Sequence, residues 1–509
     1  MSRILYLPLD ERPCNYLYPV RIAGLLDDIE VVRPDIEHMG RKKKPADIEY
    51  LMTFLEKEAS SCDIAIISLD LLLYGGIVPS RLHNFTVDQA KERLHKLKDI
   101  KRNNPHLKIY ANNLIMRVPD YNSSDEEPDY YEEYGQDIYM YSCLTDKIQK
   151  GEATEEEKKL FEALQGKIPK EFIEDYVRRR KVNEAISEMA VEMVKDGVID
   201  FLTILQEDCS VYGFFAITQR KLAALIRKYE LWDQVYIHPG ADEVGCTLMA
   251  RAINKSRGWL PKVYIRYNSE IGSRTIPLYE DRPLCESIKS QVITAGGVIV
   301  HDESAADYIL FVNAPADKMK ESIHANDMYD NSYERMRNIR EMIEALQYYV
   351  AQNKPCAVAD VAYANGGDGD LVKLLSKKEL YYKLYGYAGW NTCGNTLGTV
   401  IAHSMIAVQG KCLESPKHQR FLLERLLEDW AYQSVFRSKI TNEILPSLGL
   451  NYFWLGEQQD KKVSILREEF QNVMERYFPK YKDYNLQIER VYMPWNRMFE
   501  VGLEIGIKD

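Results

Sequence analysis

The sequence predicts an α/β fold in which a parallel sheet is covered by helices. Short aliphatic runs alternate with amphipathic helical stretches from the N-terminus onward. Runs such as Asp63–Ser68 (Asp-Ile-Ala-Ile-Ile-Ser) have an unbroken apolar centre, which is typical of strands buried on both faces of a parallel sheet. A (β/α) barrel-like fold and a doubly wound parallel sheet both fit this alternation, so both alternatives stay open.

The first block of alternating elements, residues 1–272, is expected to form an N-terminal (β/α) catalytic-type domain. Its expected strands are Ile4–Leu9, Glu30–Arg33, Asp63–Ser68, Leu107–Ala111, Asp200–Leu205, Val235–His238 and Lys262–Tyr267. Its expected helices are Leu17–Leu26, Asp47–Glu58, Thr86–Asn103, Phe172–Lys195, Thr218–Tyr229 and Cys246–Ile253. Each helical stretch is amphipathic, as a helix that packs on a sheet must be.

Residues 273–413 are expected to form a second α/β domain. The expected strands are Arg274–Leu278, Gly297–His301, Tyr308–Asn313, Cys356–Ala362 and Tyr385–Ala388, with one long charged helix at Asn331–Gln352. Residues 414–509 are expected to form a mainly helical cap that ends in a strand-like stretch, Asn485–Ile507.

The segment Val118–Pro169 is longer than an ordinary connection between a strand and a helix. Its first part, Pro119–Gly135, is rich in acids and tyrosines. A solvated insertion and a lid over a pocket are both open interpretations, because long loops in compact domains often carry function.

Composition and charge narrow the class of protein. Of 509 residues, 46% are hydrophobic and 28% charged, as in ordinary soluble globular proteins. The net charge of -11 argues against nucleic acid or an anionic membrane surface as a partner. No signal peptide, long apolar run or Cys-x-x-Cys pair is found, which favours a reduced, cytoplasmic location. A homo-oligomer is compatible with the sequence.

Polar side chains follow most of the expected strands, at the edge where ligands bind in parallel α/β folds. In the first block these residues are Asp10, Arg12, Asp70, Asn113, Asp208, His238, Asp242 and Glu243. In the second block the stretches Asp360–Asp368 and Tyr387–Thr396 occupy equivalent places. Acids, amides and aromatic side chains bind hydroxyl-rich molecules, so we expect a polar pocket for a small carbohydrate.

The adjacent carboxylates Asp242 and Glu243 are the strongest candidates for catalysis. Cleavage of a glycosidic bond needs one carboxyl group as acid and a second group that stabilises charge or acts as base. Adjacent residues at a strand end can reach different parts of one substrate. The alternative interpretation is structural, with Asp242 capping the following helix and Glu243 in its first turn.

The stretch His238-Pro-Gly-Ala-Asp-Glu-Val244 resembles a known catalytic signature. It is similar to the His-x-Gly-Gly-Asp-Glu-Val motif of the β-N-acetylhexosaminidase family, which uses substrate-assisted catalysis on a (β/α) barrel. The resemblance implies that Asp242 stabilises the 2-acetamido group, that Glu243 is the general acid/base and that His238 supports them. Ala241 stands where that motif has its second Gly.

The chain as a whole resembles an uncharacterised bacterial family. The matching motifs are Leu7-Pro-Leu-Asp-Glu-Arg-Pro-Cys14, Gly240-Ala-Asp-Glu-Val-Gly245 and Ala388-Gly-Trp-Asn-Thr392. No particular activity follows from that resemblance.

Two aromatic stretches are further candidates for the ligand site. Trp390, with Asn391 beside it, can stack on a sugar ring, although a core tryptophan fits equally well. Trp495 lies in a second aromatic and polar stretch, Met493–Met498, that can close the pocket. No P-loop and no Gly-x-Gly-x-x-Gly motif is present, so we expect no nucleotide cofactor.

The leading hypothesis is a glycoside hydrolase that acts on a small 2-acetamido sugar without a cofactor or metal. A metal-dependent hydrolase or deacetylase is the first alternative, because several acids follow strands, although their spacing matches no metal motif. The second alternative is a non-catalytic carbohydrate-binding protein.

Overall fold

The computed structural model describes residues 2–325, 331–456 and 459–508. This part of the chain divides into two compact units. The first unit is Met1–Glu11, Glu30–Ala241 and Tyr279–Asp281. The second unit is Arg12–Ile29, Asp242–Leu278 and Arg282–Asp509. Each unit is built on a parallel sheet of its own.

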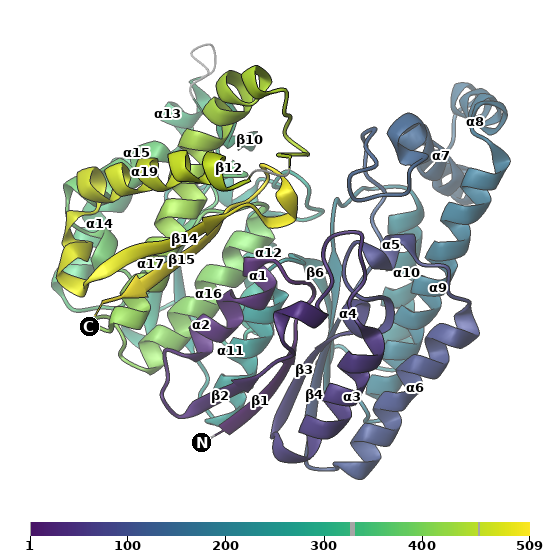
Figure 1. Cartoon of the computed structure of the whole chain (residues 1–509), viewed down its shortest axis with the longest axis horizontal. Coiled ribbons are helices and arrows are strands. Elements are labelled where there is room, and N and C mark those ends of the chain that lie inside the picture. Colours follow the sequence, from purple (N-terminus) through teal and green to yellow (C-terminus); the bar gives the residue numbers. More distant parts are fainter. Residues whose placement is uncertain (1, 326–330, 457–458, 509) are drawn as a thin grey trace. The chain divides into compact units, whose positions relative to one another are not determined.

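The sheet of the first unit has six strands among the described residues, in the order β2-β1-β3-β4-β5-β6 (Figure 1). They are β1 (Ser2–Leu7), β2 (Ile29–Val32), β3 (Ile64–Ser68), β4 (Lys108–Leu114), β5 (Phe201–Gln206) and β6 (Val235–Pro239). The recorded pairings from β1 to β6 are parallel, as Ile4 opposite Ile64 and Leu202 opposite Val235 show. Every residue of β3 and β5 is buried, which explains why these strands are mainly apolar.

Helices connect these strands and cover the sheet. They are α3 (Ile48–Glu58), α4 (Leu69–Tyr74), α5 (Pro79–Leu82), α6 (Val87–Asn103), α7 (Tyr131–Lys150), α8 (Glu155–Lys167), α9 (Lys170–Lys195) and α10 (Phe214–Lys228). Local sequence sets several of their ends. The Asp47 carboxylate caps α3 by accepting from the Tyr50 N–H at 3.0 Å, and Thr86 with Gln89 forms a capping box at α6.

The segment Val118–Pro169 contains the two helices α7 and α8 and is therefore more ordered than a loop insertion. Their apolar side chains pack with α9 in a cluster that includes Tyr131, Leu164 and Tyr176. Burial of this cluster gives the segment a small core of its own.

The sheet of the second unit has five strands among the described residues, in the order β13-β11-β9-β7-β8. They are β7 (Lys262–Tyr267), β8 (Val298–Ile299), β9 (Tyr308–Asn313), β11 (Cys356–Asp360) and β13 (Tyr387–Ala388), and the pairings are parallel. Strand β7 pairs with β8 and β9 and thus begins this second sheet. A short parallel pair joins β10 (Lys320–Glu321) and β12 (Tyr363–Ala364).

Two expectations for the second block are wrong. No strand forms at Arg274–Leu278, and a 3₁₀ turn covers Gly272–Arg274. Pro277 has no N–H to donate to a neighbouring strand, and the Thr275 carbonyl accepts a hydrogen bond from the Leu284 N–H instead. The expected helix at Asn331–Gln352 is divided into α13 (Ser332–Met336) and α14 (Ile339–Ala351).

The break between α13 and α14 has a local cause. Arg337 is extended (φ -126°, ψ 149°), and its guanidinium donates to Asp368 and to Asn313. Asn338 then caps α14, accepting from the Glu341 N–H at 3.0 Å. Charge-assisted bonds at a buried position offset the loss of one turn of helix.

The remaining helices of the second unit include a long buried one. They are α1 (Pro13–Tyr16), α2 (Tyr18–Ala23), α11 (Val244–Ser256), α12 (Leu284–Thr294), α15 (Gly369–Lys377), α16 (Cys393–Gln409), α17 (Pro416–Arg425), α18 (Arg437–Lys439) and α19 (Gln459–Tyr477). A π-helical stretch, Leu426–Phe436, follows α17. Helix α16 is buried over nearly all of its length and packs against α11 and α12.

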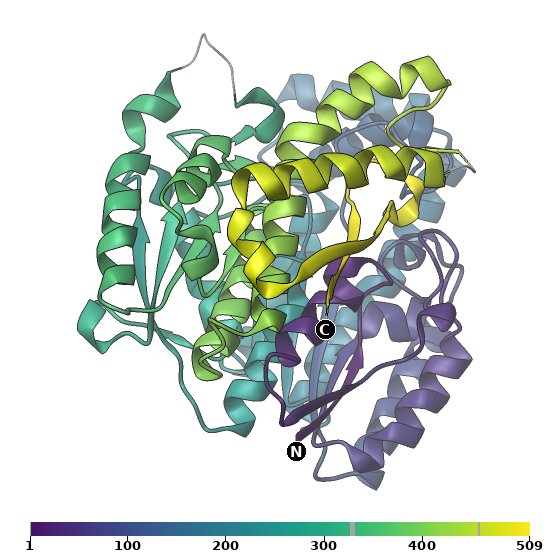
Figure 2. The ribbon, with the colours of Figure 1, turned by 60° about the vertical axis from the view of Figure 1, so that its left-hand side comes forward.

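The C-terminal region matches the expected helices, but its strand-like stretch is an antiparallel pair. The two strands are β14 (Leu486–Tyr492) and β15 (Gly502–Ile507), which lie beside α19 in Figure 2. Their inward side chains, such as Ile488 and Leu503, join the apolar core of the second unit.

Both parallel sheets have the strand order of a doubly wound α/β fold. In each sheet the chain leaves a strand (β1 or β7) for a neighbour on one side and returns to a neighbour on the other side. The mixed α/β class is confirmed, and a barrel is not confirmed. Within the described ranges, no helix combines the length and the apolar character needed to cross a membrane.

Candidate functional site

Asp242 is held by three polar partners in the second unit. Arg12 donates from Nη2 to Oδ1 at 2.5 Å and from Nη1 to Oδ2 at 3.4 Å. Asn391 Nδ2 donates to Oδ2 at 3.0 Å, and the Asp242 backbone N–H donates to Asn395 Oδ1 at 3.2 Å. The carboxylate is ion-paired and only 7% exposed, so water competes little for these bonds.

The local sequence explains how these partners are placed. Pro13 occupies the first turn of α1, which fixes the preceding Arg12 in an extended conformation (φ -63°, ψ 151°). Asn391 lies between β13 and α16 with a left-handed backbone (φ 59°), a conformation that Asn tolerates well. The local backbone conformations of Arg12 and Asn391, which lie outside the strands, thus set the directions of their side chains.

An aromatic ring, that of Trp495, lies against the Arg12 guanidinium. The Trp495 ring centroid lies 4.4 Å from Arg12 Cζ, and Arg497 Cζ lies 4.5 Å from that ring. Trp495 is left-handed (φ 53°), which is rare for a bulky residue and costs of order 1–3 kcal/mol. Trp390 packs edge-on against Phe499 at 6.1 Å, and its indole N–H is buried without a hydrogen-bond partner among the described residues.

Glu243 faces a different environment from Asp242. Its side chain is fully buried, and Oε1 accepts from Gln291 Nε2 at 2.9 Å. It packs so closely on Gly398 of α16 that a Cβ there would overlap it. Glu243 occupies the N-cap position of α11 but makes no side-chain capping bond, and Asp242 bonds to Arg12 and Asn391 instead. Capping therefore does not explain either carboxylate.

The other expected site residues belong to the first unit. Asp70 Oδ2 accepts from the Leu114 N–H at 2.9 Å and from Asn113 Nδ2 at 3.3 Å, so the structure brings Asp70 and Asn113 together. Burial raises the pKa of the Asp70 carboxyl to about 7, although these bonds partly oppose the shift. His238 Nδ1 is bonded to the carbonyl of Pro239 at 2.8 Å, and Asp10 is buried.

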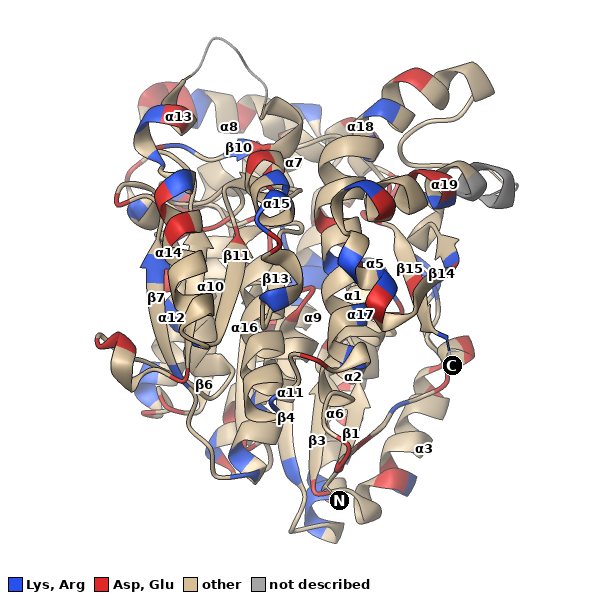
Figure 3. Ribbon diagram, turned by 90° about the vertical axis from the view of Figure 1, so that its left-hand side faces the viewer, with Lys and Arg blue, Asp and Glu red and all other residues tan. Residues whose placement is uncertain are grey.

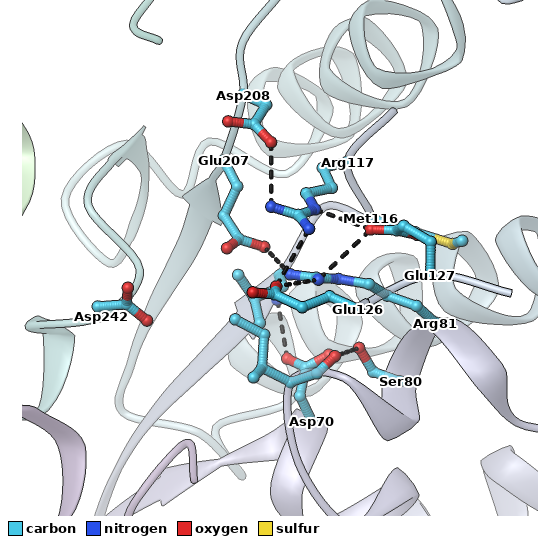
Figure 4. A network of polar contacts seen from close by, with 12 residues as sticks. Asp70, Ser80, Arg81, Met116, Arg117, Glu126, Glu127, Glu207, Asp208 and Asp242 are labelled. Carbon is cyan, nitrogen blue, oxygen red and sulfur yellow. Dashed lines mark hydrogen bonds and ion pairs between the residues drawn. The ribbon is translucent and has the colours of Figure 1, made fainter. Parts of the chain in front are cut away.

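Asp208 belongs to a network of two arginines and four acids (Figure 4). Arg117 donates to Asp208 at 3.1 Å, to Glu126 at 3.1 Å and to Glu127 at 2.9 Å. Arg81 bonds Glu126 and Glu207, each at 2.9 Å. Because Glu126 and Glu127 lie in the stretch Pro119–Gly135, this network anchors that stretch to the rest of the unit.

A third polar cluster lies at the ends of β9 and β11. Asn313 Nδ2 donates to Asp360 at 2.8 Å and to Asp368 at 3.2 Å, and the Tyr387 hydroxyl donates to Asp360 at 2.9 Å. Burial, together with the negative charge of Asp368, raises the pKa of Asp360 to about 7. The expected stretch Asp360–Asp368 thus contributes two acids that meet through one amide.

Several residues at these sites were not expected from the sequence. As individual site residues these are Gln291, Arg497 and Glu500 in the second unit and Arg81, Glu126, Glu127 and Glu207 in the first. Glu207 directly follows β5, so a strand-end signal was present for it. Arg497 lies in the expected stretch Met493–Met498, but no local pattern ties either Arg497 or Glu500 to Arg12.

The donor set does not include an assembled metal site within the described ranges: no group of three or more His, Cys, Asp or Glu side chains has a suitable arrangement. No such group is formed, among the described residues, by the candidate ligands Asp10, Asp70, Asp208, His238 and Asp242.

Comparison with known families gives a match over nearly the whole chain. The family model described as "Protein of unknown function (DUF4127)" matches residues 4–504. The chain belongs to this family. DUF4127 membership confirms the expectation of an uncharacterised family at that level. No curated protein and no solved structure matches the chain, and the resemblance to β-N-acetylhexosaminidases stays a prediction.

Proposed function

We propose that this DUF4127 protein is a glycoside hydrolase that binds a small 2-acetamido sugar at Asp242. The observation that supports the proposal is the convergence of Arg12 and Asn391 on this one carboxylate, with the Trp495 ring lying against the Arg12 guanidinium. An ionised carboxylate, an amide and an aromatic ring are the groups that a sugar ring with an acetamido substituent needs. The left-handed backbone of Trp495 adds support, because strain gathers at functional sites.

In the proposed reaction the acetamido oxygen of the substrate attacks the anomeric carbon as the glycosidic bond breaks. Asp242 accepts a hydrogen bond from the acetamido N–H and stabilises the positive charge that develops on the group. Glu243 gives its proton to the leaving oxygen, and as base it then takes a proton from the water that opens the cyclic intermediate. This role requires the Glu243 carboxyl to leave Gln291 and turn toward the ligand.

The test is hydrolysis of p-nitrophenyl β-N-acetylhexosaminides by the wild type and by Asp242→Asn and Glu243→Gln. We expect each variant to lose about 10²–10⁴-fold in kcat/KM. Asp28→Asn is the matched control, because Asp28 is an exposed partner of Arg257 in the same unit and should leave activity unchanged. Full activity in both site variants would refute the proposal.

The burial of Glu243 favours a second candidate function, a non-catalytic carbohydrate-binding protein. A fully buried carboxyl that is already bonded to Gln291 serves a structural role without any turnover. This candidate predicts that N-acetylhexosamines bind to the wild type without hydrolysis and that Glu243→Gln keeps the affinity. Activity that EDTA abolishes would instead support a metal-dependent hydrolase or deacetylase.

A further inference from the structure

The second unit contains a pocket of about 1090 Å³ next to the third polar cluster. The residues after β7 (Asn268–Ile271), the break between α13 and α14, and the start of α15 line it. Pockets of several hundred cubic ångströms hold metabolite-sized ligands. None of the residues around Asp242 lines this pocket, so the inference below is independent of the proposed hydrolase.

The topology places the pocket where a doubly wound sheet opens. The order β8-β7-β9 means that the chain turns to opposite sides after β7 and after β9. Connections that leave toward opposite faces create a crevice at the carboxyl ends of the strands, and ligands of such folds bind there. Asn268, directly after β7, is one of the lining residues and donates to Asn313 at the end of β9 at 2.5 Å.

Arg337 is the central cation of the pocket. It is 7% exposed, its Nη2 donates to Asp368 and Asn313, and its guanidinium lies 4.7 Å from the Tyr333 ring and 5.7 Å from the Tyr363 ring. Its Nε–H is buried and has no hydrogen-bond partner among the described residues. A buried guanidinium N–H without an acceptor costs free energy that an oxyanion would recover.

Exposed basic side chains also line the pocket that contains Arg337. Arg335, Arg340, Lys373 and Lys377 line the pocket, and no ion pair of theirs is recorded within the described ranges. Figure 3 shows α13, α14 and α15, which carry these residues, with basic and acidic positions on each. The first turn of α14, at Asn338–Arg340, also lines the pocket and adds the positive end of a helix dipole.

Acidic side chains limit the charge that the pocket accepts. Asp368 is neutralised by Arg337, while Glu270, Glu334 and Asp370 stay on the rim. With four cations against three acids among the described lining residues, the rim favours one oxyanion group over a polyanion. The amides of Asn268 and Asn338 and the two tyrosine rings suit a polar carbon skeleton.

We propose that this pocket binds a small polar metabolite through one oxyanion, a phosphate or a carboxylate, which Arg337 Nε and the first turn of α14 contact. Asp368 positions the guanidinium, and Arg340 and Lys373 strengthen the attraction from the rim. The division of the expected helix at Arg337 is the backbone change that brings this side chain into the pocket.

The test is isothermal titration of the full-length protein with glucose 6-phosphate, gluconate, inorganic phosphate and glucose. We expect a charged probe to bind and glucose to bind at least tenfold more weakly. A preference for glucose 6-phosphate assigns a phosphate, and a preference for gluconate assigns a carboxylate. Equal binding of glucose, or no binding of any probe, would overturn the proposal.

Substitutions of the pocket residues test whether the preferred probe binds in this pocket. Arg337→Gln should weaken the preferred charged probe at least tenfold, and the exposed rim variants Arg340→Gln and Lys373→Gln should weaken it about three- to tenfold each. Lys417→Gln is the matched control, because Lys417 is an exposed cation on α17 of the same unit, is paired with Asp27 and lies outside the pocket lining. If Arg337→Gln does not fold, the two rim variants decide: affinity equal to the wild type in both refutes the pocket.

Discussion

At the scale of the residue, close packing fixes Glu243 in the second unit. Gly398 on α16 leaves no room for a side chain beside it. Gly398→Ala should therefore destabilise the protein by about 1–3 kcal/mol, because overpacking in a dense core forces neighbours to shift. Thermal denaturation measures this.

Gly166 in α8 gives the matched control for that prediction. No heavy atom lies within 4 Å of a Cβ built there, and the residue is helical. Gly166→Ala should raise stability by about 0.4–1 kcal/mol, because it lowers the entropy of the unfolded chain. Equal effects of the two substitutions would show that Glu243 does not pack on Gly398.

Asp70 makes stability depend on pH. Its carboxyl has a pKa of about 7 in the folded protein against 3.8 ordinarily, so the folded protein binds more protons than the unfolded chain between these values. The contribution of Asp70 is therefore fully present below about pH 4 and is lost as pH rises through 7. When the pH is raised from 5 to 8, the free energy of unfolding of the wild type should fall. In Asp70→Asn that fall should be about 2–3 kcal/mol smaller.

Denaturant titrations at both pH values measure that difference. Asp200 is the control: although burial opposes it, hydrogen bonds from Lys101 and Lys108 lower its pKa. Its contribution is lost only as pH falls below its ordinary value, so Asp200→Asn should destabilise equally at pH 5 and pH 8. A pH dependence that Asp70→Asn leaves unchanged would contradict the assignment.

At the scale of the element, short sequence signals place the helix ends. Thr154 and Glu157 form a capping box at the start of α8, with Thr154 Oγ1 accepting from the Glu157 N–H at 3.2 Å. Thr154→Ala should cost about 1 kcal/mol of local stability, seen as faster hydrogen exchange in the first turn of α8.

Two further substitutions are controls for the prediction on α8. Thr154→Ser keeps the hydroxyl and should keep the protection. Thr86→Ala removes the equivalent cap of α6 and should speed exchange there without any change in α8. Unchanged exchange in Thr154→Ala would mean that tertiary packing alone holds this turn.

The division between α13 and α14 shows where element-scale signals end. The stretch Asn331–Gln352 has no Pro or Gly, so its pattern predicts an unbroken helix. The extended Arg337 is stabilised by Asp368 and Asn313, which are far along the chain. Helix propensity is worth only tenths of a kcal/mol per residue, and a buried charge-assisted bond exceeds that.

At the scale of the whole molecule, each compact unit has its own sheet and its own apolar core. Unfolding should therefore depart from a two-state transition, with a calorimetric enthalpy larger than the van't Hoff enthalpy. Asp70→Asn, in the first unit, should shift one component of the calorimetric trace and leave the other in place. A single transition with equal enthalpies would contradict this.

The sequence alone determined the α/β class, most strand positions and the family. Mainly apolar runs place β3, β5 and β9, because a strand buried on both faces has few polar positions. The polar side chains at or just after strand ends, Asp70, Asn113 and Asp360 among them, were predictable as a class, since every parallel strand ends at the same edge of its sheet.

Only the tertiary structure decided which polar groups meet. Arg12 and Asp242 are 230 residues apart in sequence, and Arg337 meets Asp368 across 31 residues. Local spacing carries no information on such partners, because packing of the sheets and helices sets them. For the same reason the adjacent Asp242 and Glu243 have different environments, one bonded to Arg12 and the other enclosed beside Gly398.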